Sequence, residues 1–103
     1  MNFNNFTIKS QEAIQHAFEV AQGRQNQAIE PGHLLKGLFH EAENVIGFLL
    51  KKVGSNPVVI QQALDRVVDS YPKVTGGEPY LSSDSNKALQ KSVAVMQEMG
   101  DQF

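Results

Sequence analysis

The three histidines, His16, His33 and His40, are the residues that could bind a metal ion or transfer a proton near neutral pH, and the sequence has no cysteine. His33 and His40 are seven residues apart, which places them on one helix face, and Glu41 is next to His40. Two imidazoles that share an ion on a helix have i, i+4 spacing, and this spacing is missing. His16 belongs to another predicted helix, so we predict no metal site.

A second group with possible chemistry is the run Ser82-Ser83-Asp84-Ser85. A serine nucleophile of the Gly-x-Ser-x-Gly type needs a strand, a sharp turn and a helix around it, and this context is absent. Serines before an apolar helical pattern are typical of a helix N-terminal cap. The sequence also contains no Gly-Lys pair and therefore no phosphate-binding loop. We predict that this chain is not an enzyme.

Composition restricts the class of protein further. The 103 residues fit one domain with one core, and 41% hydrophobic and 19% charged residues are ordinary for a globular protein. A formal charge of -2 gives no basic surface for nucleic acid. The N-terminus lacks a signal-peptide pattern and no apolar run is long enough to span a membrane, so we expect no membrane partner and a cytoplasmic location.

Apolar periodicity predicts helices along most of the chain. A loop or linker is predicted at about 72–80, where two prolines and two glycines fall close together. No strand is predicted, because the β-branched run 58–60 lies inside a helical period. The predicted helices have these signals: Thr7 as N-cap of the first, Pro31 at the start of the second, Gly54 after the third, and Asn56-Pro57 opening the fourth.

An internal repeat relates the start of the chain to its end. Ala13-Ile14-Gln15 recurs 75 positions later as Ala88-Leu89-Gln90, and the same offset carries Thr7 onto Ser82 and Ser10 onto Ser85. Helical periodicity alone accounts for part of this match. In this register Ala28 falls on Phe103, so we expect the chain to stop inside its second repeat.

Four segments resemble the N-terminal domain of the Clp ATP-dependent chaperones: Phe6-Thr7, Ala17-x-x-x-Ala21, the run IEPGHLLKGL at 29–38, and GDQF at 100–103. The resemblance implies an all-α fold of tandem four-helix repeats, with the second repeat truncated after its first helix. The whole chain, 1–103, would be one incomplete domain. Repeat 1 would cover about 1–71, the linker about 72–80 and the start of repeat 2 about 81–103.

The function that the resemblance implies is recognition of unfolded or aggregated polypeptide, and the Ile-Glu-Pro-x-His-Leu form is most similar to the disaggregases of the family. Such a domain is joined to two ATPase modules that bind ATP and Mg²⁺, assemble as a hexamer and thread substrates through its pore. Contact with an Hsp70-type chaperone system would be made through other domains. We expect no cofactor in this domain itself.

Two alternatives stay open. One is the N-domain of a protease-associated Clp unfoldase, which recruits adaptor proteins or phosphorylated arginines. The phosphoarginine-binding relatives carry Glu just before the motif histidine, whereas this chain has Gly32 there, and this difference favours the disaggregase. The other is a stand-alone helical adaptor module.

Capture of unfolded chains needs an apolar groove with a few polar groups at its edge. Surface side chains of the last helix are candidates for the groove, and the resemblance places Thr7 and Asp101 at its edge. Each candidate also has a structural explanation: Thr7 as a helix cap, Asp101 as a turn residue, and the aliphatic residues as core. Relatives often carry an apolar residue in place of Lys91, and the family motif suggests that His33 fixes a helix start. The predicted substrate-binding residues are Thr7, Leu89, Lys91, Val95, Met99 and Asp101.

Self-association is the first testable prediction. Without the rest of a second repeat, the Leu89, Val93 and Met96 face stays partly uncovered, and burial of each such side chain is worth roughly 1.5–3 kcal/mol. We expect the chain to self-associate or to exchange its last helix with a second copy. Light scattering at high concentration measures this. A strict monomer whose last helix resists hydrogen exchange would contradict the expectation.

Overall fold

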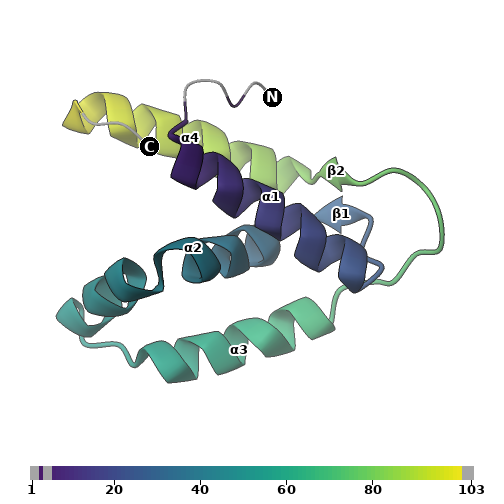
Figure 1. Cartoon of the computed structure of the whole chain (residues 1–103), viewed down its shortest axis with the longest axis horizontal. Coiled ribbons are helices and arrows are strands. Elements are labelled where there is room, and N and C mark those ends of the chain that lie inside the picture. The colour runs from purple at the N-terminus through teal and green to yellow at the C-terminus, as the bar shows by residue number, and fades with distance from the viewer. Residues whose placement is uncertain (1–2, 4–5, 101–103) are drawn as a thin grey trace.

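Helices form most of the structure, a computed structural model that describes residue 3 and residues 6–100 (Figure 1). The fold is all-helical, as predicted, except for two very short strands. The elements, in chain order, are α1 (Ile8–Gly23), β1 (Ala28–Ile29), α2 (Pro31–Lys52), α3 (Pro57–Asp69), β2 (Tyr80–Leu81) and α4 (Ser83–Met99).

The helices begin where the sequence predicts. Thr7 and Ser82 cap α1 and α4, and each side-chain oxygen accepts a hydrogen bond from the backbone N–H three residues later. Asn56 caps α3 in the same way, through the N–H of Val58. The two capping serine or threonine residues are related by the 75-residue offset, so the first helix of each predicted repeat starts through the same local interaction.

The second and third predicted helices are the two halves of the span labelled α2. They meet at a kink, where Ala42 has non-helical backbone angles (φ −139°, ψ 42°). Neither glycine nor proline lies between His40 and Val45, so no residue there enforces a connecting loop. The non-helical Ala42 therefore divides α2 into two helical halves.

The strand pair was not predicted. Ala28 pairs in parallel with Tyr80, and Ile29 with Leu81, so β1 and β2 join two segments far apart in sequence. Tyr80 had been placed at the end of the predicted linker. Two residues are too few to show a period of two, and the pairing depends on a long-range contact that no local pattern reveals. The pair brings the start of α4 beside the connection between α1 and α2 (Figure 1).

Two apolar clusters form the core. One centres on Ala17, Ala21 and Ile29, with Phe18, Leu34 and Leu81 packed against it, and it joins both strands to α1 and α2. The other holds α3 onto α2, and its buried members are Phe39, Leu64 and Val68. Two surface ion pairs, Arg24–Asp69 and Lys36–Asp65, add smaller stabilisation between α3 and the other two helices.

The closest approach of α1 and α2 depends on Gly37. A Cβ at this position would overlap the backbone carbonyl of Ala13, which cannot move as a side chain can. We expect Gly37→Ala to lower the free energy of unfolding by about 1–3 kcal/mol, because the two helices must separate. Urea unfolding measures this change.

Gly47→Ala is the matched control. Gly47 lies in the same helix, and a Cβ there would have Pro57 Cγ as its nearest neighbour at 4.0 Å, an ordinary contact. Alanine there should stabilise the helix by about 0.5–1 kcal/mol. Equal effects of the two substitutions would contradict the role assigned to Gly37.

Candidate functional site

A buried polar network fixes the connection between α1 and α2. His33 is fully buried, and its Nδ1 accepts a hydrogen bond from the backbone N–H of Glu30 (2.9 Å). Its Nε2 lies 2.9 Å from Oδ1 of Asn26, whose amide nitrogen donates to the carbonyl of Pro72. With Nδ1 as an acceptor, Nε2 carries the proton and donates a hydrogen bond to Oδ1 of Asn26, so the ring is neutral. His33 therefore fixes the start of α2, as expected.

The carbonyl of Ile29 links this connection to α4. It accepts one hydrogen bond from the hydroxyl of Ser85 (2.6 Å) and another from the backbone N–H of Ser82 (3.1 Å). Ser85 is fully buried, and its own N–H donates to the Ser82 hydroxyl. The serine run that could have suggested a nucleophile thus caps α4 and anchors it to β1.

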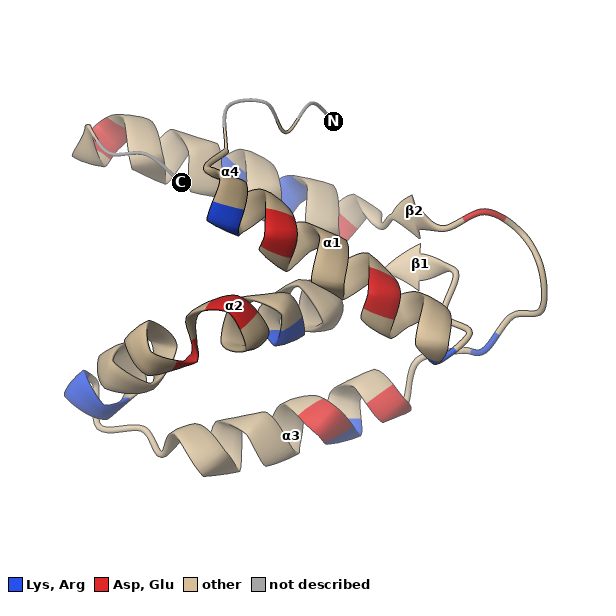
Figure 2. Ribbon diagram, viewed as in Figure 1, with Lys and Arg blue, Asp and Glu red and all other residues tan. Residues whose placement is uncertain are grey.

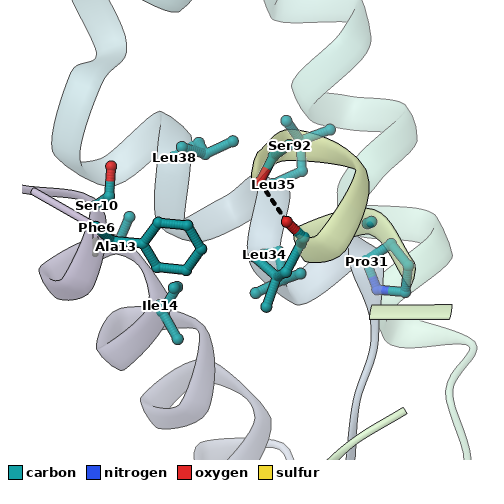
Figure 3. A pocket seen from close by; sticks show the side chains of 11 residues that line it. Phe6, Ser10, Ala13, Ile14, Pro31, Leu34, Leu35, Leu38 and Ser92 are labelled. Atoms are coloured by element: carbon teal, nitrogen blue, oxygen red, sulfur yellow. Dashed lines mark hydrogen bonds between the residues drawn. The ribbon is translucent and has the colours of Figure 1, made fainter. Parts of the chain in front are cut away.

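An apolar pocket of about 300 Å³ lies between α1, the first half of α2 and α4 (Figure 3). The only polar side chains among its lining residues are two serines, and none of these residues is charged. The hydroxyl of one of them, Ser92, donates to the carbonyl of Leu89 (2.7 Å) and is therefore satisfied within α4. The pocket is lined by Phe6, Ser10, Ala13, Ile14, Pro31, Leu34, Leu35, Leu38, Ala88, Leu89 and Ser92.

The sequence-predicted site residues lie partly at this pocket. Leu89 lines it, and Thr7 lies in the chain between the pocket residues Phe6 and Ser10 while capping α1. Val95 (38% exposed) and Met99 (70% exposed) are on the surface of α4, as is Lys91, and none of the three lines the pocket. Asp101 lies outside the described residues.

Most of the pocket residues were missed as site residues by sequence reasoning. Leu34, Leu35 and Leu38 were recognised as the apolar stripe of a helix, but a stripe does not reveal which of its members border a hollow. The repeat offset held a usable signal for α4. It carries the Ala13, Ile14 side of α1, on which α2 packs, onto Ala88 and Leu89. A second apolar packing face on α4 could have been predicted from it.

His33 and His40, which were predicted to share one helix face, lie in different surroundings. His33 is buried, whereas His40 is exposed and stacks on His16 of α1, with ring centroids 3.8 Å apart and planes 8° from parallel. Oε2 of Glu19 lies 3.6 Å from Nδ1 of His16, and Oε1 of Glu41 lies 4.0 Å from Nε2 of His40. Over residues 3 and 6–100, no group of three or more potential ligands is arranged to hold a metal ion.

Gly32, which precedes the motif histidine, faces the ring of Tyr71. A Cβ at Gly32 would lie 2.5 Å from the Tyr71 hydroxyl oxygen. Burial raises the pKa of Tyr71 above its ordinary value of 10.0, so the hydroxyl stays protonated at neutral pH. A glutamate at position 32 would therefore require the tyrosine ring to move.

The model of the Clp repeat (R) N-terminal domain family matches residues 5–103. The match covers nearly the whole chain, and the described helices and the repeated capping serine and threonine residues agree with it. The chain therefore belongs to the Clp repeat (R) N-terminal domain family.

Its relatives are chaperones. The chain is 52% identical over all 103 residues to the chaperone protein ClpB of Bacteroides thetaiotaomicron, and 45% identical to ClpB of Porphyromonas gingivalis. In both cases it spans 12% of the length of the relative. The homology supports the role of a chaperone N-domain.

Solved structures show the same fold at low sequence identity. The N-terminal domain of the ClpV1 ATPase from E. coli superposes with a TM-score of 0.85 at 22% identity, covering 96% of this chain and 61% of that one. The Hsp104 N-terminal domain from Candida albicans gives a TM-score of 0.84 at 20% identity, covering 97% and 67%. Over the described residues no helix is long and apolar enough to cross a membrane.

His33 makes the stability of the domain depend on pH. Burial lowers the pKa of His33 below its ordinary value of 6.5, so below that pH the unfolded chain binds a proton that the folded chain resists. Stability is complete above pH 6.5 and falls as the pH decreases toward the folded-state pKa. The expected slope is at most about 1.4 kcal/mol per pH unit.

Urea unfolding from about pH 7.5 to about pH 5 measures this slope. His33→Gln should flatten the dependence, whereas His40→Gln, on the surface, should leave the His33 contribution in place. An unchanged slope in the His33 variant would show that another group is responsible.

Proposed function

We propose that this chain is the substrate-recognition domain of an ATP-dependent protein disaggregase. It captures unfolded or aggregated polypeptide and delivers it to a hexameric ring of ATPase modules in a longer protein, where ATP and Mg²⁺ are bound. The observation that carries the proposal is the uncharged apolar pocket between α1, α2 and α4. The homology to ClpB chaperones supports it.

The chemistry of the pocket suits a substrate without a defined sequence. Burial of apolar area contributes roughly 25 cal/mol per Å² for any aliphatic or aromatic side chain, so such a pocket discriminates little among unfolded chains. About 300 Å³ accommodates one or two large side chains rather than a folded surface. Polar groups of the peptide backbone can be met by the residues predicted for the edge, Thr7, Lys91 and Asp101.

The internal repeat supports binding of an apolar segment. On α1, the side that includes Ala13 receives α2 at close range through Gly37. The equivalent side of α4, which includes Ala88 and Leu89, borders the pocket instead. The Ala13 side of α1 packs tightly against an apolar helix, so the equivalent side of α4 is suited to contact apolar groups of a bound chain.

The alternative is the N-domain of a protease-associated unfoldase that binds adaptors or phosphorylated arginines. The close packing of Gly32 on Tyr71 disfavours a glutamate at that position, and glutamate precedes the motif histidine in the phosphoarginine-binding relatives. This observation ranks the disaggregase proposal first.

The test is an amide chemical-shift titration with reduced and alkylated α-lactalbumin, a permanently unfolded protein. We expect saturable shifts around the pocket and at Thr7, Lys91 and Val95. Leu38→Ser removes a partly exposed apolar side chain of the pocket and should weaken binding about tenfold or more.

Val58→Ser is the matched control, because Val58 is an exposed aliphatic residue of α3 outside the pocket. It should leave the affinity unchanged. A folded domain that shows no shifts, or equal losses for the two variants, would refute capture through this pocket.

A further inference from the structure

The second half of α2 carries an apolar surface that neither the core nor the pocket uses. After the kink at Ala42, one face of the helix presents four large apolar side chains to solvent: Val45 (58% exposed), Phe48 (59%), Leu49 (52%) and Val53 (76%). Together with Lys52 they are called the Phe48 stripe below. None of its residues lines the apolar pocket.

Helix geometry places the stripe on one continuous face. At 100° per residue, the four residues of the stripe inside α2 fall within an arc of about 100° and rise about 10 Å along the helix, and Val53 follows as the C-cap. The neighbouring residues Ile46 and Leu50 lie beside this face and pack against the Phe39, Leu64 and Val68 cluster. Among the described residues, the core is therefore closed without the Phe48 stripe, whose apolar side chains are exposed.

The C-terminal end of the stripe is basic, whereas Glu41 and Glu43 precede its N-terminal end on the same helix. From residue 44 to residue 64 the only charged residues are Lys51 and Lys52, although the whole chain has a formal charge of -2. The Nζ of Lys52 lies 5.5 Å from the centre of the Phe48 ring. Figure 2 shows this basic end of α2 in blue, next to the uncharged first half of α3.

We propose that the Phe48 stripe is a docking site for an acidic amphipathic helix of another protein. The apolar residues have the i, i+3, i+4 and i+8 spacing that meets the apolar side of a partner helix. Carboxylates on the partner would pair with Lys51 and Lys52. The proposal is independent of the apolar pocket and goes beyond recognition of unfolded chains.

A second copy of this chain fits the stripe less well. A stable dimer needs about 800 Å² of buried surface per partner, and four side chains on three turns of one helix supply only part of it. A membrane surface also fits poorly, because recognition of anionic lipid uses clusters of about four to eight cationic residues. Two lysines beside a short apolar stripe suit a weak and reversible contact with one helix.

The test uses two synthetic peptides of about 18 residues, long enough to be partly helical. Both carry the same leucine stripe at helical spacing, flanked by glutamates in one peptide and by lysines in the other. In an amide chemical-shift titration of the whole chain, we expect the glutamate peptide to shift residues 45–53 with saturation. The lysine peptide should bind more weakly, by a factor of at least about five.

Two variants separate the apolar from the electrostatic contribution. Phe48→Ser should lower the affinity for the glutamate peptide about tenfold. The double variant Lys51→Glu, Lys52→Glu should reverse the preference, so that the lysine peptide binds more tightly. Val67→Ser is the matched control, since it removes an exposed valine of α3 outside the stripe and should have no effect.

Circular dichroism confirms that each variant is folded, which the exposure of the substituted residues leads us to expect. The proposal is overturned if the two peptides bind equally, if the shifts lie at the apolar pocket, or if charge reversal leaves the preference unchanged. Binding of the chain to anionic phospholipid vesicles but not to the glutamate peptide would overturn it in favour of a lipid surface.

Discussion

The carbonyl oxygen of Ile29 is the interaction on which the arrangement of the domain depends. It accepts hydrogen bonds from Ser85 and from the backbone of Ser82, so both of its lone pairs are used. Ile29 is itself fully buried in the cluster with Ala17 and Ala21. One backbone group therefore connects the first helical unit to α4, and the β1–β2 pairing holds the same two segments in register.

The anchored end of α4 explains why a pocket exists beside it. Ser85 holds α4 at its first turn, and Ala88, Leu89 and Ser92 then pass over the apolar surfaces of α1 and α2 without closing onto them. On the other side of Ile29, the buried His33 and Asn26 keep the start of α2 fixed. A rigid frame around an incompletely filled apolar space is what capture of varied apolar side chains requires.

The features that sequence could predict are local ones. Thr7, Asn56 and Ser82 act within three residues of themselves, and the apolar periods of the helices are local as well, so all were predictable. The strand pair was missed because Ala28 and Tyr80 meet only through the tertiary fold. For the site, periodicity identified the helix faces but not their surroundings. Leu89, a predicted site residue, lines the pocket, whereas its neighbours there from α2 were predicted only as a helix stripe. Lys91 and Val95 lie on the same helix but do not line the pocket.

Amide hydrogen exchange of the Ser85→Ala variant tests most directly whether this one anchor holds α4 in place. Loss of the hydroxyl leaves Ile29 with one donor and removes about 0.5–1.5 kcal/mol of stabilisation at that point. We predict faster exchange in α4 and at residues 80–81, with α3 unchanged and with no effect of the exposed neighbour Ser83→Ala. Unchanged exchange in α4, or equal acceleration in all helices, would contradict the account.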